Sequence, residues 1–174
     1  MIELLKREDF DEMFAIMEES FPKDEYRTRE GQKHLFELPE YQAYAMRDED
    51  TGHIKGFIAV WELETVVFVE HFAVNPRFRN GGLGAKILQE LRGRYDKPLC
   101  LEVELPETEM AVRRIGFYER NGFFLNRYPY KQLPLAEGQN ELPLYIMTTE
   151  KAVDADEFEA IKELLYATVY QVVG

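Results

Sequence analysis

Apolar residues recur along this chain with two different spacings, which separate predicted helices from predicted strands. Five segments place apolar side chains three or four residues apart after a polar capping residue or a glycine turn, as amphipathic helices do. These predicted helices cover 10–21 after the cap Asp9, 29–38 after the cap Thr28, about 82–95, and 109–120 after the cap Thr108. A last one begins after Asp154 or Asp156 and carries its apolar face to Val169. Seven further segments are rich in Val, Ile and aromatic residues, as strands are. The predicted strands are 1–5, 41–47, 54–63, 65–74, 99–104, 123–128 and 142–149.

The order of these elements predicts the fold class. It reads strand, two helices, three strands, helix, strand, helix, two strands and helix, without an intervening linker. We therefore expect a single α/β (α+β) domain over 1–174, with a mixed central sheet of about seven strands flanked by helices. The sheet should be antiparallel at first, with one parallel pair joined by a helical crossover in its middle. Residues 151–174 would form a C-terminal helical extension.

Composition narrows the classes of function. Hydrophobic residues make up 45% of the 174 residues, enough for a sizeable core. The formal net charge of −12 argues against sequence-independent nucleic-acid binding, which needs Lys and Arg against phosphates. An acidic surface either attracts a cationic ligand or only keeps the protein soluble. The start of the chain lacks a signal-peptide pattern, and no apolar run approaches the ~20 residues of a membrane-spanning helix. We therefore expect a soluble, cytoplasmic protein with no membrane partner.

The strongest chemical signal is the glycine-rich turn between the fourth predicted strand and the third predicted helix. It reads Arg79-Asn80-Gly81-Gly82-Leu83-Gly84-Ala85. The first N–H groups of a helix have no partner within it, and glycines let the backbone close around an anion. Five basic residues and one acidic residue lie between Arg77 and Arg94, in a chain that is acidic as a whole. A pyrophosphate-like ligand would explain both features, whereas the alternative, an ordinary strand-to-helix turn, explains only the glycines.

Two other glycine motifs do not fit this turn. A P-loop requires Gly-Lys followed by Ser or Thr, but here Lys86 follows Ala85 and precedes Ile87. The dinucleotide fingerprint requires a third glycine three positions after Gly84, where Ile87 stands. The turn therefore matches neither class of nucleotide site.

The turn and a second motif together resemble a known family. Arg79-x-x-Gly82-x-Gly84 looks like the pyrophosphate-binding signature of the GNAT superfamily of N-acetyltransferases, and the preceding Ala73-Val74-Asn75-Pro76 fits the family's strand end. The segment Ile115-Gly116-Phe117-Tyr118-Glu119-Arg120-Asn121-Gly122-Phe123 resembles its second motif, a helix with a Tyr and a Gly-Phe ending. The resemblance covers roughly residues 1–150, so the last helix lies outside it. One departure is Ala111, where many members carry an Asn seven residues before the Tyr.

The resemblance implies acetyl-CoA, or another acyl-CoA, as the acyl-donor substrate. In the family, two neighbouring parallel strands splay apart and admit the pantetheine arm. Carried over to this chain, those strands are 65–74 and 99–104. Backbone groups of Phe72, Ala73 and Val74 would pair with the pantetheine amides. The pyrophosphate would lie beside Arg79 and face the N–H groups of Asn80, Gly81, Gly82, Leu83, Gly84 and Ala85.

Two residues are candidates for proton transfer. The resemblance places Tyr118 in the position of the family's acid, and its hydroxyl stays protonated at neutral pH. Alternatively, Tyr118 is a core residue, because it shares helical spacing with apolar neighbours. Glu70 is the candidate base, since burial in its apolar strand would raise the pKa of its carboxyl. It could equally face solvent or pair with an Arg, and Glu102, Glu104 or a water relay are alternatives.

Other chemistry is less favoured by the sequence. In a regular strand, His71 points to the opposite face from Glu70 and is more readily interpreted as structural. The three histidines show no ligand spacing, so we expect no metal site. Cys100, the only cysteine, lies in an apolar strand without an evident base partner, so we expect no thiol nucleophile.

These observations predict an acyltransferase that moves an acetyl group from acetyl-CoA to a primary amine of a small molecule or peptide, by direct attack with base and acid assistance. In the family, the first two helices and the loop between the last strands set the acceptor. Carboxylates and aromatic side chains in these regions suggest a cationic acceptor; the aromatic residues are Phe21, Tyr26, Phe36, Tyr128 and Tyr130. The alternative is a non-catalytic acyl-CoA-binding sensor or interaction module on the same fold. Dimerisation is common in the family, so a homodimer is a candidate assembly, although the sequence fixes no symmetry.

Overall fold

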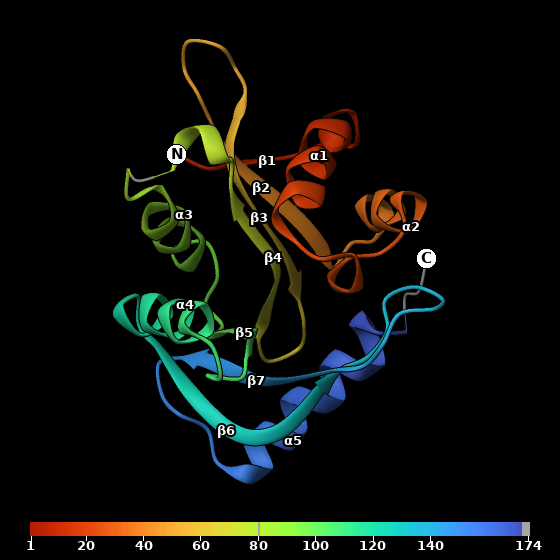
Figure 1. Ribbon diagram of the computed structural model, residues 1–174, viewed down its shortest axis with the longest axis vertical. Helices are drawn as coiled ribbons and strands as arrows, with labels where there is room; N and C mark the ends of the chain where they lie inside the picture. The colour runs from red at the N-terminus through yellow and green to blue at the C-terminus, as the bar shows by residue number, and fades with distance from the viewer. Residues whose placement is uncertain (80, 172–174) are drawn as a thin grey trace.

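A seven-stranded mixed sheet forms the centre of the computed structural model, which describes residues 1–79 and 81–171 (Figure 1). The strands lie in the order β1-β2-β3-β4-β5-β7-β6. Their bounds are β1 Glu3–Leu4, β2 Tyr41–Arg47, β3 Ile54–Glu62, β4 Val67–Val74, β5 Leu99–Glu104, β6 Phe123–Gln132 and β7 Leu142–Thr149. All neighbouring strands are antiparallel except β4 and β5, which run parallel. The predicted mixed sheet, with one parallel pair in its middle, is therefore confirmed.

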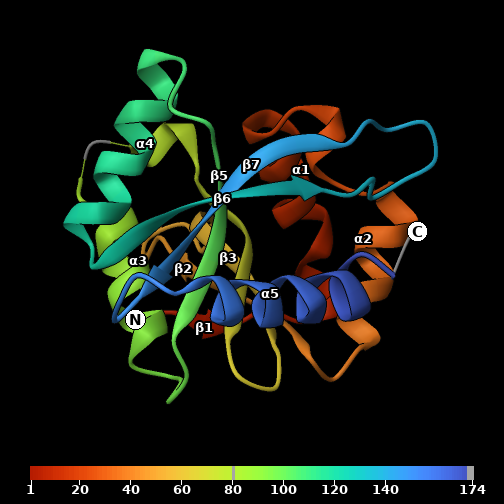
Figure 2. The same ribbon diagram turned by 90° about the horizontal axis from the view of Figure 1, so that it is seen from below.

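Helices cover both faces of this sheet (Figures 1 and 2). α3 Leu83–Arg92 and α4 Glu109–Arg120 lie against one face, whereas α1 Phe10–Ser20, α2 Arg29–His34 and α5 Ala155–Leu164 lie against the other. A π-helical turn, η5 Leu165–Val169, continues α5. The short 3₁₀ turns are η1 Arg7–Asp9, η2 Lys23–Glu25, η3 Leu35–Glu37 and η4 Pro76–Phe78. Over residues 1–79 and 81–171, no helix is long and apolar enough to cross a membrane.

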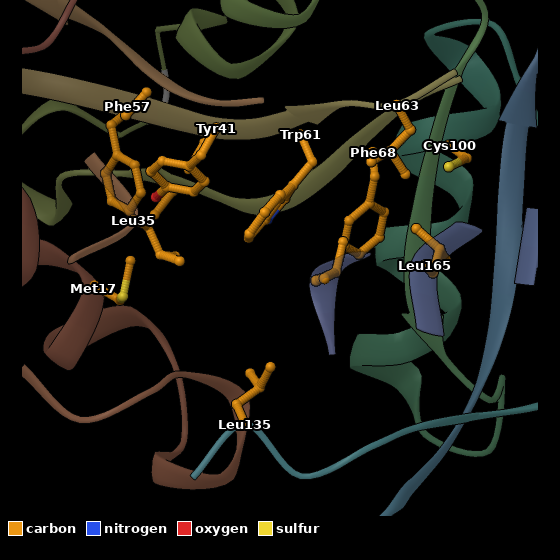
Figure 3. Packing of buried hydrophobic residues seen from close by; sticks show 14 of the residues in the cluster. Met17, Leu35, Tyr41, Phe57, Trp61, Leu63, Phe68, Cys100, Leu135 and Leu165 are labelled. Carbon is orange, nitrogen blue, oxygen red and sulfur yellow. The ribbon is translucent and has the colours of Figure 1, made fainter. Parts of the chain in front are cut away.

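Two apolar layers hold the helices to the sheet. β3 contributes to both, because Phe57 and Trp61 face the layer under α1 and α5 while Ile58 and Val60 face the layer under α3. Figure 3 shows Trp61 and Phe68 projecting from the strands toward the segments that contribute the rest of the first layer. A strand buried on both faces reads as a continuous apolar run, as β3 does. Burial of each such large side chain contributes about 1.5–3 kcal/mol.

Side-chain caps set the starts of three helices. The hydroxyls of Thr28 and Thr108 and the carboxylate of Asp154 each accept a hydrogen bond from the backbone N–H three residues further on, at 2.8 to 3.1 Å. Asp154, rather than Asp156, is thus the last cap. Asp9 occupies the N-cap position of α1, but its carboxylate accepts a hydrogen bond from the Lys6 N–H instead. The prediction that Asp9 caps this helix is therefore wrong.

Two elements differ most from their predicted bounds. The second predicted helix, 29–38, ends at His34, and a 3₁₀ turn follows it. β6 continues to Gln132, whereas the predicted strand ended at Tyr128. β6 lies at the edge of the sheet, and its register shifts between Asn126 and Tyr130. Pro129 therefore sits within the strand without interrupting a ladder hydrogen bond.

Candidate active site

β4 and β5 pair over only three residues and then separate. The paired positions run from Val67 with Leu99 to Val69 with Leu101. Beyond them, β4 stays paired with β3 and β5 with β7, and a cavity of about 240 Å³ opens between the two strands. Within the described part of the chain, no strand pairs with the two edges that face each other here. Their backbone N–H and C=O groups are therefore available to a ligand.

Six of the residues proposed from the sequence meet in this cavity, whereas those of the glycine turn after Arg79 are not part of its lining. Its lining includes Glu70, Phe72, Ala73, Val74, Arg79 and Tyr118. β5 adds Glu102 and Glu104, and the segment after α1 adds Glu25. Gly81, Gly82, Leu83, Gly84 and Ala85 form the turn and helix start that follow Arg79. Asn80 lies outside the described residues.

The turn after Arg79 starts α3 with unpaired backbone donors. Gly82 has a φ of 70°, in the left-handed region that glycine adopts without strain. The first hydrogen bond of the helix runs from the Lys86 N–H to the Gly82 carbonyl at 3.3 Å, so the N–H groups before Lys86 have no acceptor within the helix. No described side chain caps them, and the first turn carries no acidic residue. These donors and the helix dipole favour an anion.

Gly84 lets the first turn of α3 approach its neighbours closely. A Cβ atom at this position would lie 3.3 Å from the ring of Phe117 and 3.4 Å from the ring of Phe72. The two rings lie 6.4 Å apart between centroids and join α4 to β4. A larger residue would displace this packing, because buried side chains have little room to move.

A β-bulge sets the direction of the polar side chains on β4. The ladder with β3 leaves Glu70 as an extra residue between Val69 and His71. The extra residue breaks the alternation of the strand, so Glu70 reaches Arg27 while His71 packs against Phe21, both on the side of α1 and α2. The prediction that His71 points away from Glu70 is therefore wrong.

The Glu70 carboxylate forms a buried ion pair. Arg27 Nη1 donates to Oε1 at 3.0 Å, Nη2 lies 3.0 Å from Oε2, and Trp61 Nε1–H donates to Oε1 at 2.9 Å. Burial acts to raise the pKa of Glu70, but the charge of Arg27 and the hydrogen bonds from Arg27 and Trp61 outweigh it, and the pKa is lowered. The predicted rise is thus wrong, and the pairing with an Arg is the alternative that the structure contains. A carboxylate held in this way is a weak base.

His71 is fixed in one tautomer. Its Nε2 lies 2.6 Å from the backbone carbonyl oxygen of Glu25, which can only accept, so Nε2 carries the proton. Burial lowers the pKa of His71, which keeps the ring neutral. His71 thereby ties β4 to the turn after α1 at the wall of the cavity.

Glu102 is the carboxyl group with the properties of a base near neutral pH. It belongs to β5, just beyond the point where β5 leaves β4, and it lines the cavity. Burial raises its pKa to about 7, although hydrogen bonds from the hydroxyls of Tyr130 and Tyr170 oppose the rise. Tyr130 donates to Oε2 at 2.5 Å, and Tyr170 donates to the same oxygen. At neutral pH both protonation states are populated, as proton transfer requires.

Tyr118 lines the same cavity as Glu102. Burial raises the pKa of its hydroxyl to about 12, so it is protonated at neutral pH. Its ring packs edge-on against Phe117 and Phe123, at centroid distances of 5.3 and 5.5 Å. No described residue hydrogen-bonds its hydroxyl. Tyr118 is thus a packed side chain with a proton available for donation.

The sequence also raised two other kinds of chemistry, a thiol nucleophile at Cys100 and a metal site. Cys100 is fully buried, and burial raises the pKa of its thiol far above the usual range, so it is not a thiolate. In the residues that the structure describes, no group of three His, Cys, Asp or Glu side chains could hold a metal ion.

Sequence reasoning missed three residues that shape the site: Arg27, Trp61 and Tyr170. Arg27 lies in a polar stretch between two helices, where nothing local indicates that its side chain is 1% exposed. Trp61 reads only as an apolar strand residue. Tyr170 lies in the C-terminal extension, outside the motifs that pointed to the site. The one usable signal was Glu70, the lone charge in β4. A buried Glu needs a cationic partner somewhere in the chain, which here is Arg27.

The chain is similar in sequence and in fold to known acetyltransferases. The family model described as "Acetyltransferase (GNAT) family" matches residues 8–123. A solved GNAT-family structure from Bacteroides thetaiotaomicron, provisionally named an acetyltransferase, is 36% identical, with a TM-score of 0.86 over 98% of both chains. YjbC of Bacillus subtilis (strain 168), also provisionally named an acetyltransferase, is 26% identical over 86% of this chain and 77% of its own. An aminoglycoside 6'-N-acetyltransferase solved with coenzyme A has the same fold, with a TM-score of 0.60 at 17% identity over 88% of this chain and 99% of its own.

Proposed function

Since this chain belongs to the GNAT family of acetyltransferases, we propose that it is an N-acetyltransferase. It transfers the acetyl group of acetyl-CoA to a primary amine of a small molecule or a peptide. One observation carries the proposal: the cavity between β4 and β5 is lined by Arg79, which precedes the open start of α3, and by a carboxyl group and a phenol with complementary proton affinities. A pair of groups whose pKa values are driven apart can supply a base and an acid at the same pH.

The residues at the helix start fit the phosphates of coenzyme A. The first N–H groups of α3 lack acceptors within the helix. Apart from Gly82 and its two chain neighbours, no described residue has an atom within 4 Å of the position that a Cβ atom of Gly82 would take. Arg79 lines the cavity beside them and supplies positive charge. We assign the pyrophosphate to Arg79 and the N–H groups of 80–85, and the pantetheine arm to the open backbone edge of Phe72, Ala73 and Val74.

Acetyl-CoA, as the donor substrate, supplies an activated acetyl thioester. Glu102, as the ionised carboxylate, accepts a proton from the acceptor's ammonium group, which leaves a neutral amine able to attack the carbonyl carbon. Backbone N–H groups near Phe72 and Ala73 stabilise the negative charge that develops on the carbonyl oxygen. As the C–N bond forms and the C–S bond breaks, the Tyr118 hydroxyl donates its proton to the leaving sulfur. The nitrogen gives up a second proton as it becomes an amide, which restores the Tyr118 hydroxyl, and Glu102 releases its proton to solvent.

We assign the base to Glu102 in preference to Glu70. Both carboxyl groups line the cavity, but Arg27 holds the pKa of Glu70 below its usual value, while burial raises that of Glu102 to about 7. A base whose pKa lies near the working pH is both ionised and able to hold a proton. Glu70 then acts through its ion pair, which supports the wall of the cavity.

A cationic amine is the acceptor that the far side of the cavity favours. Glu25 stands there, and burial together with the nearby Glu104 raises its pKa, which marks a site that would gain from a positive charge. Phe21 adds an apolar surface beside it. An acceptor with an ammonium group and an apolar body would match both features.

Thiol release from acetyl-CoA, measured across a panel of primary amines, tests the proposal. We expect Glu102→Gln and Tyr118→Phe each to lower kcat by about 10²-fold or more while acetyl-CoA still raises the melting temperature. Glu107→Gln, an exposed carboxylate beyond the end of the same strand and outside the lining of the cavity, is the matched control and should retain activity. Stabilisation by acetyl-CoA without thiol release for any amine would instead favour the non-catalytic acyl-CoA sensor.

A further inference from the structure

The Glu102 carboxyl group is held by two tyrosines from distant parts of the chain. Tyr130 comes from β6 and Tyr170 from the residue after η5, and both hydroxyls donate to Oε2. Each tyrosine is at most 5% exposed. No described residue donates to Oε1, and the side chain lines the cavity. One oxygen is thus anchored by the protein, while the other is left for a ligand. We call Tyr130 and Tyr170 the tyrosine clamp.

The C-terminal extension is built so that Tyr170 reaches this position. α5 packs on the sheet through Phe158, whose ring lies 4.9 Å from that of Tyr128 and 6.2 Å from that of Tyr130. The π-helical turn η5 then closes with a hydrogen bond from the Tyr170 N–H to the Leu165 carbonyl at 3.2 Å. A π turn shifts the helix register by one residue and often occurs at functional sites.

The same turn also reaches the second carboxylate of the site. The carbonyl oxygen of Val169 accepts a hydrogen bond from Arg27 Nη2 at 3.2 Å, and Arg27 in turn holds Glu70. Figure 2 shows α5 crossing beneath the sheet toward α2, which begins two residues after Arg27. Two consecutive residues, Val169 and Tyr170, therefore connect the extension to both buried carboxylates.

We infer that Tyr170, together with Tyr130, is a positioning residue that fixes the Glu102 carboxylate and favours its ionised form, which makes the C-terminal extension part of the active site. The inference rests on the proposed function only for the role of Glu102 as base. Hydrogen bonds to a carboxylate stabilise its charged form, so each hydroxyl opposes the effect of burial.

The other titratable groups around Glu102 either shift its pKa or stay uncharged near pH 7. Glu70 on β4 and Glu25 in η2 are acids that favour its neutral form. Tyr166 on η5 and Cys100 on β5 are neutral near pH 7, because the charge of Glu102 and burial raise both of their pKa values. Loss of one clamp hydroxyl should therefore raise the pKa of Glu102 by about one unit, and the acid limb of kcat/KM should move upward with it.

Tyr170→Phe tests the inference, with Tyr166→Phe as the matched control. Tyr166 lies in the same turn, but its hydroxyl donates to the Lys131 carbonyl at 2.6 Å and not to Glu102. We would titrate the ¹³C carboxyl signal of Glu102, identified by its absence from Glu102→Gln, in the protein without acetyl-CoA. We expect a midpoint near 7 in the parent protein and in Tyr166→Phe, and a higher midpoint in Tyr170→Phe. The pH profile of kcat/KM should show the same displacement, with activity recovering at high pH.

A second variant keeps the test decisive if Tyr170→Phe does not fold. Tyr130→Phe removes the other donor and retains the ring that packs against Phe158, and melting curves identify which variants are folded. An unchanged Glu102 midpoint in the folded clamp variants overturns the positioning role, whatever the activity. If Glu102→Gln keeps full activity while the midpoint still moves in the clamp variants, the assignment of the base fails and the clamp stands.

Discussion

Replacing Arg27 by Met should destabilise the protein by about 3–5 kcal/mol, because it leaves a buried carboxylate without its counter-charge. The Arg27 side chain is 0% exposed and that of Glu70 3% exposed, so water cannot take the place of the guanidinium. Met preserves much of the volume of the side chain, which keeps the cavity contribution small. The hydrogen bonds from Arg27 to Gln32 and to the Val169 carbonyl are lost as well.

The double variant Arg27→Met/Glu70→Gln separates the charge from the rest of the loss. Gln is neutral, and its amide oxygen can still accept the hydrogen bond that Trp61 now gives to Glu70. The double variant should therefore be more stable than Arg27→Met alone by about 2 kcal/mol or more, since an uncompensated buried charge accounts for most of the cost.

The dependence of stability on pH follows from the direction in which the pKa of Glu70 is shifted in the parent protein and in Arg27→Met. In the parent protein the pKa of Glu70 is lowered, so the ion pair contributes stability above the unfolded value near 4.5 and loses it as the pH falls. Without Arg27, burial should raise that pKa, so Arg27→Met loses further stability as the pH rises above about 4.5. The deficit of Arg27→Met should thus be large at pH 7 and shrink toward pH 4.

Urea unfolding followed by circular dichroism and by fluorescence measures these differences. Trp61 is the only Trp and is fully buried, so its emission reports unfolding directly. Equal stability of Arg27→Met and the double variant, or a deficit that does not change between pH 7 and pH 4, would refute the reasoning.

Two further predictions concern local structure. Gly82→Val should cost about 1–2 kcal/mol, because Gly82 has a positive φ, and should abolish the acetyl-CoA-dependent rise in melting temperature; Gly52→Val, with a φ of 77° in the β2–β3 turn, should cost a similar amount but keep that rise. An unchanged rise in Gly82→Val, or its loss in both variants, would count against the phosphate site. Thr108→Ala should lower the free energy of unfolding in urea by about 1 kcal/mol through loss of the α4 cap, and Thr108→Ser should restore it; equal stability of the two variants would contradict a role for the hydroxyl.

The sequence predicted the sheet and the glycine turn well because both depend on short-range patterns. The bounds of β2, β5 and β7 follow from apolar runs flanked by turn residues, and the open start of α3 follows from its glycines. The ion pair and hydrogen bonds between the buried polar side chains could not be predicted in the same way. The bulge at Glu70 has no local signature, yet it decides which face His71 takes.

Long-range contacts account for the remaining differences. Arg27 and Tyr170 reach carboxylates that lie 43 and 68 residues away in the chain. Their roles depend on burial and on pairing partners that no window of neighbouring residues contains. Pro129 caused a different error. A proline usually marks the end of a strand, so the predicted strand ended at Tyr128, but a strand at a sheet edge can continue through a proline.

The position of β7 between β5 and β6 has a consequence for the newly made chain. When β6 has left the ribosome, residues 142–149 are still to come, so β5 and β6 each expose an unsatisfied edge with no neighbour between them. Unpaired strand edges can pair with other chains, which makes this interval an aggregation-prone stage of synthesis. A chain that stops at residue 141 should accumulate as insoluble material, because its last strand, and not its length, completes the sheet.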